Sequence, residues 1–476
     1  MDKPISRRRF LSGLALSGGS VLLAACGSPT VSSPAAESGA PAAPAMPAAS
    51  SSGGFDWMQE NGKTISLAFA KHPMSDTLIQ LLPEFKSQTG ITVNYEAYPE
   101  EEFFQKLLVD LSTRQGTYDA FMCGPVNYKQ YAAPGWIEPL DGYLSDPKLT
   151  ASDYDLDDFY PAALGVNRWD KEKGLTGLGQ GPLYAIPVNE EGYSLFSRKD
   201  VLEKAGIKPP ESFAELLEAA TKLNGFEMDG KKLNGFVARG NKTFPTLTGG
   251  FSSLFWGYGA SDLTADGKVD ITSAKSIEAH KMWGELMSLA PQAVGSYTWY
   301  EAMNDFAAGN AVFFIDANHM AEFFEDPTKS AVAGKVNYGL PPAGPDGTRA
   351  CGIWLWSLGM SSASQNKNAA WLFLQWASSK AVLEKAIPLH NINPTRQSLA
   401  NSPTMKEYTA SWGNYNDTWQ TILADHAKWR YMASPKFPEI GDRWALGVQQ
   451  IILKESSAED ALAAAASDIE AILAGV

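Results

Sequence analysis

The order of secondary structure is set by Thr64–Cys123, TISLAFAKHPMSDTLIQLLPEFKSQTGITVNYEAYPEEEFFQKLLVDLSTRQGTYDAFMC. In its first seven residues, large apolar side chains alternate with smaller ones, which is typical of a strand. The next apolar residues, from Leu78 to Phe85, recur at helical spacing until Gly90, a residue type that commonly ends helices. The pattern then repeats, with strands predicted at 91–95 and 118–123 and a helix between them. Such an order implies parallel strands joined by right-handed crossovers.

The segments at the ends of these three strands are the first candidates for a binding site. Ligands of such sheets bind beyond the carboxyl ends of the strands, and these segments contain His72, Tyr98 and Asn127. A second region of strands and helices opens after Pro209-Pro210, where Ser212 and Glu215 have the spacing of a capping box. We expect later strands at 311–315 and 353–360, and an Ala-rich amphipathic helix at 457–476.

The first 26 residues have the pattern of a bacterial export and lipidation signal. A twin-arginine motif at Arg7–Arg9 precedes an apolar stretch, and Leu23-Ala24-Ala25-Cys26 has the form of a lipobox. We therefore expect residues 1–25 to be a signal peptide and Cys26 to be lipidated. A transmembrane anchor is the alternative, but spanning needs about 20 apolar residues and this stretch is shorter and interrupted by Ser and Gly.

Residues 26–62 read as a tether, because their first part consists almost entirely of Ser, Ala, Pro and Gly. We expect an exported protein, at the cell surface or in the periplasm, that is held at the membrane through Cys26. The remaining body is long enough for two domains.

The chain is acidic, with a formal net charge of −14 over 476 residues. Removal of residues 1–25 takes away four positive charges and one negative charge, which leaves −17. This surface disfavours nucleic acid and acidic lipid headgroups as partners. Cys123 and Cys351 lie in apolar, strand-like runs, so we expect two unpaired buried thiols, although a disulfide is permitted outside the cell.

No motif in the chain points to a metal site or a catalytic centre. Asp153-x-Asp155-x-Asp157 begins like a calcium loop, but Asp158 stands where Gly is required. The five histidines lack the spacing of metal ligands, and G-x-S-x-G is absent. We expect no metal, no cofactor and no enzymatic activity. A glycosidase-type enzyme stays the alternative, since its two carboxylates need not be close in sequence.

From residue 63 onwards, the order of motifs resembles the extracellular solute-binding proteins of bacterial ABC importers, family 1, which includes maltose binders. The segments that carry the resemblance are Leu183–Pro187, Tyr193–Asp200, Lys204–Ile207, Phe306–Ala311, Ser330–Val336, Gly352–Trp356, Pro394–Arg396 and Phe437–Ile440. Among them, 330–336 and 352–356 look most like the branch that binds sugar alcohols such as mannitol and sorbitol. One departure is Gly124-Pro125, which follows the third strand where many relatives carry an acidic residue.

The resemblance implies an α/β, two-lobed periplasmic-binding-protein-like fold of type II, with doubly wound sheets and a hinge between the lobes. Lobe 1 would comprise residues 63–187 and 350–390, and lobe 2 residues 188–349 and 391–476. The implied function is to capture a sugar alcohol, monosaccharide or small oligosaccharide in the cleft and deliver it to a membrane permease with its ATPase subunit. We expect the protein to be a monomer.

A sugar or polyol carries hydroxyls at its edge and a C–H face, so planar polar side chains and aromatic rings are the expected binding groups. The candidate ligand-binding residues are His72, Tyr98, Asn127, Trp256, Trp299, Asp316, Trp354, Trp356 and Arg396. Trp354 and Trp356 are two apart in a predicted strand and therefore share one face, either against a ligand or in the core. The structural alternatives are packing for Trp256 and Trp299, a helix cap for Asp316, an ion pair for Arg396, and a capping or surface position for His72.

Overall fold

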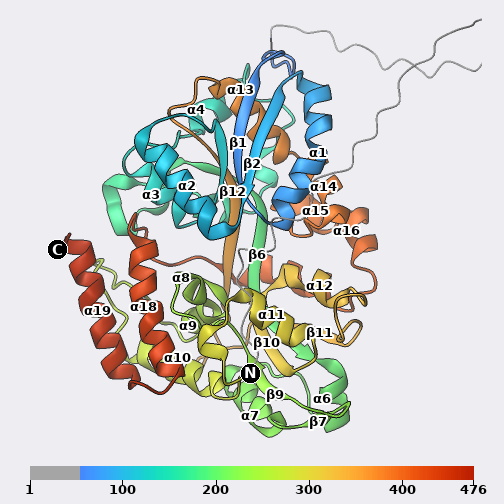
Figure 1. Ribbon diagram of the computed structural model, residues 1–476, viewed down its shortest axis with the longest axis vertical. Coiled ribbons are helices and arrows are strands. Elements are labelled where there is room, and N and C mark those ends of the chain that lie inside the picture. Colours follow the sequence, from blue (N-terminus) through green and yellow to red (C-terminus); the bar gives the residue numbers. More distant parts are fainter. Residues whose placement is uncertain (1–53, 476) are drawn as a thin grey trace, which may run out of the picture. The chain divides into compact units, whose positions relative to one another are not determined.

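The three strands predicted first are present in the computed structural model, which describes residues 54–475 with the side chain of residue 101 excepted. They are β1 (Thr64–Ala70), β2 (Thr92–Tyr98) and β3 (Ala120–Cys123). Since β1 pairs in parallel with both β2 and β3, the order is β2-β1-β3. The crossovers α1 (Pro73–Thr89) and α2 (Glu100–Thr113) lie on either side of these strands (Figure 1), as right-handed connections require.

Helix α1 begins and ends where its sequence predicts. His72 is the N-cap, and its side chain and that of Ser75 form a reciprocal capping box. Gly90 closes the helix in the left-handed conformation, with φ 71°, which glycine adopts without steric cost. The apolar residues of the predicted stripe, Leu78 to Phe85, are buried against the sheet and its covering helices.

Two long strands join the two halves of the main sheet. β6 (Ala185–Arg198) and β12 (Cys351–Met360) are buried along their whole length and pair antiparallel with each other. β12 also pairs with β3, whereas β6 pairs with β10 (Ala311–Ala317), so the sheet has the order β2-β1-β3-β12-β6-β10-β9. Figure 1 shows β6 and β12 running through the middle of the body, between the half that contains β1 and the half that contains β10.

The second half of the body is also built from strands and helices. β9 (Asn234–Val237) runs parallel to β10, β11 (Val336–Gly339) pairs with β6, and β13 (Ala427–Lys428) pairs with β12. Small ribbons are formed by β4 (Arg168–Trp169) with β5 (Leu178–Leu183) and by β7 (Glu227–Met228) with β8 (Lys231–Lys232). Helices around this half include α6 (Lys199–Ala205), α7 (Phe213–Leu223), α8 (Phe244–Thr246), α9 (Ser252–Gly257), α10 (Ala274–Met287), α11 (Trp299–Ala307) and α12 (Ala321–Glu325).

The remaining α-helices lie in other parts of the chain: α3 (Asn127–Ala132), α4 (Asp141–Ser145), α5 (Pro161–Val166), α13 (Lys367–Ala377), α14 (Lys380–Ala386), α15 (Gln397–Ala400), α16 (Pro403–Tyr408), α17 (Tyr415–Thr421), α18 (Phe437–Ile452) and α19 (Ala458–Ala474). The last of them confirms the predicted Ala-rich helix. Helix α7 starts at the predicted Ser212, whose hydroxyl accepts from the Glu215 amide. The Glu215 carboxylate accepts from the Glu211 amide instead of completing the capping box.

Two predicted strand ends were wrong by a few residues. β2 continues through Tyr98 and β10 through Ala317, so Tyr98 and Asp316 lie inside strands and not after them. Cys123 and Cys351 are buried and free, as predicted. Within residues 54–475 no helix is long and apolar enough to cross a bilayer. The predicted signal peptide and Cys26 lie outside the described residues.

Candidate functional site

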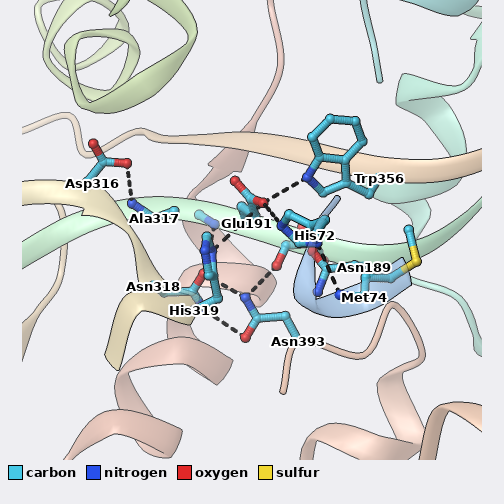
Figure 2. A network of polar contacts seen from close by, with 12 residues as sticks. His72, Met74, Asn189, Glu191, Asp316, Ala317, Asn318, His319, Trp356 and Asn393 are labelled. Carbon is cyan, nitrogen blue, oxygen red and sulfur yellow. Dashed lines mark hydrogen bonds and ion pairs between the residues drawn. The ribbon is translucent and has the colours of Figure 1, made fainter. Parts of the chain in front are cut away.

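The carboxylate of Glu191 is the centre of a polar cluster on the middle of β6 (Figure 2). Its Oε1 accepts from Trp356 Nε1 at 2.9 Å and from His72 Nε2 at 3.1 Å, and His319 Nδ1 lies 3.8 Å away. Burial raises the pKa of Glu191, but nearby His319, the hydrogen bond from His72 and the charge of Arg239 outweigh it and lower the pKa to about 2. Glu191 is therefore an ionised, buried acceptor at neutral pH.

His72 has two structural partners that together fix its tautomer. Its Nδ1 accepts from the Met74 amide at 3.1 Å, as the N-cap of α1. Nδ1 must therefore carry a lone pair, so the proton of the neutral ring is on Nε2 and is donated to Glu191. The structural alternative for this residue, a helix cap, is thus realised, and its role toward a ligand stays a prediction.

His319 follows β10 in the second half of the body and is held there by its neighbour. Asn318 Oδ1 accepts from the Gly192 amide at 3.0 Å and from Asn393 Nδ2 at 2.9 Å, which ties the residue to β6 and to the stretch around Asn393. The His319 ring is 5.7 Å from that of His72. Burial lowers the pKa of His319, so its neutral form is favoured.

Aromatic rings cover the face of β12 beside Glu191. Trp354 pairs with Glu191 and Trp356 with Asn189 in the antiparallel register, so these side chains share one face of the sheet. The Trp356 ring stacks against Phe104 of α2, with centroids 6.2 Å apart. The Trp354 ring stacks against Phe244 of α8 at 6.4 Å and meets Trp429 at 6.0 Å.

The departure at Gly124 makes room for one of these rings. A Cβ atom at Gly124 would lie 2.2 Å from Trp354 Cζ2 and 3.0 Å from Asn127 Oδ1. Any side chain at this position would displace the tryptophan. The position of Trp354 therefore depends on a glycine directly after β3.

Several buried polar atoms around these rings have no hydrogen-bond partner. They are the donors Trp354 Nε1 and Trp429 Nε1, the acceptor Asn127 Oδ1, and His319 Nδ1, which donates or accepts according to the tautomer of its ring. Buried polar groups in native proteins are nearly always paired, so unpaired donors beside unpaired acceptors indicate missing bonds to solvent or ligand. A hydroxyl group can accept from the first kind and donate to the second.

Asp316 is held by an ion pair within the second half of the body. Arg239 Nε donates to Asp316 Oδ2 at 2.8 Å and Nη2 to Oδ1 at 2.5 Å, and both side chains are buried. The guanidinium also lies over the Tyr193 ring, 5.4 Å from its centroid. The two charges cancel, and little of the Asp316 carboxylate is left for another partner.

Three potential metal ligands converge here, which their scattered positions in the sequence did not predict. Ligand atoms of His72, Glu191 and His319 all lie within 4.8 Å of one another. The tautomer of His72 does not fit metal binding, because Nε2 carries the proton as long as Nδ1 caps α1. The cluster is better suited to hydrogen bonding than to coordination.

Comparisons with known proteins identify the family. Residues 71–384 match the family model described as "Bacterial extracellular solute-binding protein". The chain belongs to this family. It is 32% identical to the erythritol/L-threitol-binding protein of Mycolicibacterium smegmatis, over 95% of this chain and 93% of that protein. It is also 24% identical to the mannitol-binding protein of Pseudomonas aeruginosa, over 68% and 71% of the two chains.

A solved relative has the same fold. The ABC transporter solute-binding protein of Agrobacterium radiobacter in complex with ribitol superposes with a TM-score of 0.76, at 25% identity, over 87% of this chain and 99% of that one. The predictions of the family, of a two-lobed α/β fold and of a binding protein that is not an enzyme are thus confirmed.

Five of the nine predicted site residues lie around the cluster of this solute-binding protein. His72 and Trp356 donate hydrogen bonds to Glu191, and Trp354 packs beside them. Asn127 lies near the Trp354 ring, and Asp316 forms an ion pair with Arg239. Their role toward a ligand stays a prediction.

The other four predicted residues have different surroundings. Trp256 is fully buried and its ring packs against those of Trp429 and Tyr431. Tyr98 donates to Glu96 at the edge of the sheet, and Trp299 is 38% exposed at the start of α11, against Tyr300. The Arg396 guanidinium donates to the carbonyls of Ser378, Asp155 and Tyr154, each at 2.8 Å, and forms an ion pair with Asp158.

Sequence reasoning missed Glu191, His319, Arg239 and Trp429. For two of them, Glu191 and His319, the sequence contains an indication. Glu190-Glu191 lies between the apolar run Leu183–Val188 and the mostly apolar run Tyr193–Phe196, where acids are rarely buried without a reason. His319 follows a strand, as His72 does, and so meets the rule that selected His72. Arg239 and Trp429 had no comparable signal.

Glu190, the neighbour of Glu191, lies on the opposite face of β6. Its side chain is fully buried, and neither carboxylate oxygen has a hydrogen-bond partner. The Glu190 amide donates to the Asn393 carbonyl, and the Glu190 carbonyl accepts from Asn393 Nδ2. Burial raises its pKa to about 8, so it is a neutral acid at pH 7. The adjacent acids of this strand are thus in opposite protonation states.

A cavity of about 740 Å³ is separate from this cluster. It is lined by residues 207–211, by one face of α7 and by β11, together with Arg349, Asn414 and Thr418. None of the predicted site residues lines it.

Proposed function

We propose that this solute-binding protein captures a neutral polyol or small sugar between its two lobes and delivers it unchanged to an ABC permease with its ATPase subunit. The observation that carries the ligand chemistry is the set of unpartnered donors and acceptors at Trp354, Trp429, Asn127 and His319. Hydroxyl groups satisfy both kinds, and the tryptophan rings suit a C–H face. The relatives are named for binding erythritol, L-threitol and mannitol, or were solved with ribitol, and these compounds support the same class of ligand.

The lobes of the proposal are residues 63–187 with 350–390 and residues 188–349 with 391–476. His72 and Asn127 belong to the first of these, and Asp316 and His319 to the second. A ligand that bonds both sets favours the closed arrangement by its differential affinity.

Calorimetric titration of the purified full chain with erythritol, L-threitol, ribitol, mannitol, sorbitol and maltose tests the proposal. We expect one-to-one binding of at least one short polyol, and full recovery of that compound after incubation. Folded protein that binds none of them would contradict the proposal, and so would conversion of any of them.

We further propose that the protein is exported by a twin-arginine signal at residues 1–25, tethered through lipidated Cys26 and monomeric. The sequence pattern of residues 6–26 supports the export and the anchor. In cells that express the Cys26→Ser variant, the protein should be found in the soluble fraction and not in the membrane fraction. Retention of the variant in membranes would point to an uncleaved anchor.

A further inference from the structure

We propose that the site selects its ligand by charge, and that Glu191 is the residue that makes the selection. The site would accept neutral polyols and reject sugar acids of the same carbon length. This inference rests on the proposed function. It adds the property that separates accepted from rejected ligands.

The ion pair beside Glu191 contributes no net charge. Arg239 and Asp316 hold each other through two hydrogen bonds, and Arg239 Nη1 also donates to the Pro245 carbonyl at 3.3 Å. Gly249 leaves room for the guanidinium, since a Cβ there would be 3.0 Å from Arg239 Nε. Three of the five N–H groups of the arginine are thus engaged, which fixes its guanidinium toward Asp316.

When both rings are neutral, the two histidines leave the Glu191 charge uncompensated. His72 can cap α1 only with an unprotonated Nδ1, so its ring is neutral in this arrangement. Burial favours the neutral form of His319. The hydrogen bonds to Glu191 from His72 and Trp356 therefore come from neutral N–H groups.

Other charged groups near the aromatic face do not reverse this balance. Burial raises the pKa of Tyr193, and the charge of Glu100, which is therefore negative in this region, raises it further. Lys129 is buried behind the loop after β3, where it donates to the Pro125 carbonyl at 2.5 Å, and burial lowers its pKa to about 7. The ionised carboxylate beside these polar atoms is that of Glu191, and its direct donors are the N–H groups of His72 and Trp356.

A second carboxylate within about 5 Å of a buried carboxylate is strongly disfavoured. With the effective dielectric constant of protein sites, the repulsion corresponds to about a 100-fold loss of affinity. A neutral hydroxyl at the same place instead donates a charge-assisted hydrogen bond to Glu191.

The test compares ribitol, D-ribonate and D-ribonamide by calorimetric titration of the purified full chain at pH 7.5. Ribonate and ribonamide share one carbon skeleton and differ in charge. We expect ribitol and ribonamide to bind with affinities within about 10-fold of each other, and ribonate to bind about 100-fold more weakly. Because this comparison uses the unmodified protein, it does not depend on the folding of a variant.

Glu191→Gln removes the charge and keeps the shape of the side chain. Ribitol should bind about 10-fold more weakly to the variant, and the ratio of ribitol to ribonate affinity should shrink by about 10-fold or more. Glu190→Gln is the matched control, because it makes the same change on the other face of β6. It should leave both affinities as in the unmodified protein.

Equal binding of ribonate and ribitol to the unmodified protein would overturn the inference and leave the proposed function standing. An unchanged ratio in folded Glu191→Gln would also overturn it. If neither ribitol nor any other compound of the polyol panel binds, the proposed function itself fails, and this inference fails with it.

Discussion

At the scale of single residues, two neighbouring acids in one strand have opposite roles. Glu191 faces aromatic and imidazole donors and stays ionised, whereas Glu190 faces the core without a partner and keeps its proton. Strand geometry produces this contrast, because successive side chains point to opposite faces. Their adjacency in the sequence does not reveal which acid faces the site.

Glu190 should make the protein less stable as the pH rises from about 4.5 to 8. The folded state holds the proton up to a pKa of about 8, while an unfolded glutamate releases it near 4.5. The stabilising contribution is therefore complete below pH 4.5 and is lost as the pH approaches 8, by at most about 1.4 kcal/mol per pH unit. Glu190→Gln has no titrating proton at this position. The free energy of unfolding of the variant should therefore rise relative to that of the unmodified protein as the pH increases from 4.5 to 8.

Urea unfolding at pH 5, 6, 7 and 8 measures this difference. Glu191→Gln is the control: the pKa of Glu191 is lowered to about 2, so its contribution is lost only as the pH falls below about 4.5. The difference in free energy of unfolding between that variant and the unmodified protein should be constant from pH 5 to 8. If the corresponding difference for Glu190→Gln is equally constant, Glu190 is not protonated in the folded protein.

Trp354→Ala should weaken polyol binding by about 1–3 kcal/mol, because the variant loses the ring against which a C–H face packs. Trp299→Ala is the matched control, since Trp299 is partly exposed on α11 and meets Tyr300. Calorimetric titration of both variants gives the comparison. Unchanged affinity with a lowered melting temperature in Trp354→Ala would assign that residue to the core alone.

At the scale of elements, helix α1 combines a structural and a functional role in its first residue. His72→Ala should lose both the cap and the donor to Glu191, and the lost cap costs about 1 kcal/mol of stability. His72→Asn should keep the cap, because asparagine is a good N-cap, but should lose the donor to Glu191. We therefore expect weakened polyol binding in both variants and reduced stability mainly in the alanine variant.

Unfolding curves and titrations of the two His72 variants separate these effects. If the asparagine variant binds ribitol as tightly as the unmodified protein, His72 is a helix cap and no more.

Local patterns predicted the elements better than the site. Alternating apolar residues and Gly90 located β1, α1 and β2, because strand period and helix termination are encoded locally. The ends of β2 and β10 were misplaced because pairing with neighbouring strands extends them past the alternating run. The meeting of His72, Glu191 and His319 could not be predicted, since it depends on how β1, β6 and β10 are placed in one sheet.

At the scale of the whole molecule, two strands, β6 and β12, run between the two halves of the body beside the cluster. The stretch 391–395 lies along β6, because the Asn391 and Asn393 side chains bond to the backbone of Val188 and Glu190. The register of β6 and β12 shifts between Trp356 and Ser357, next to these bonds. Rotation of one half against the other would therefore change the distances between the side chains of the cluster.

A crystal structure of the protein with the tightest-binding polyol of the panel tests the central claim most directly. We predict one polyol between the lobes, with hydroxyls bonded to Glu191 and His319 and its carbon chain against Trp354. A polyol bound instead in the cavity lined by α7 and β11, with the Glu191 cluster unchanged, would contradict the account.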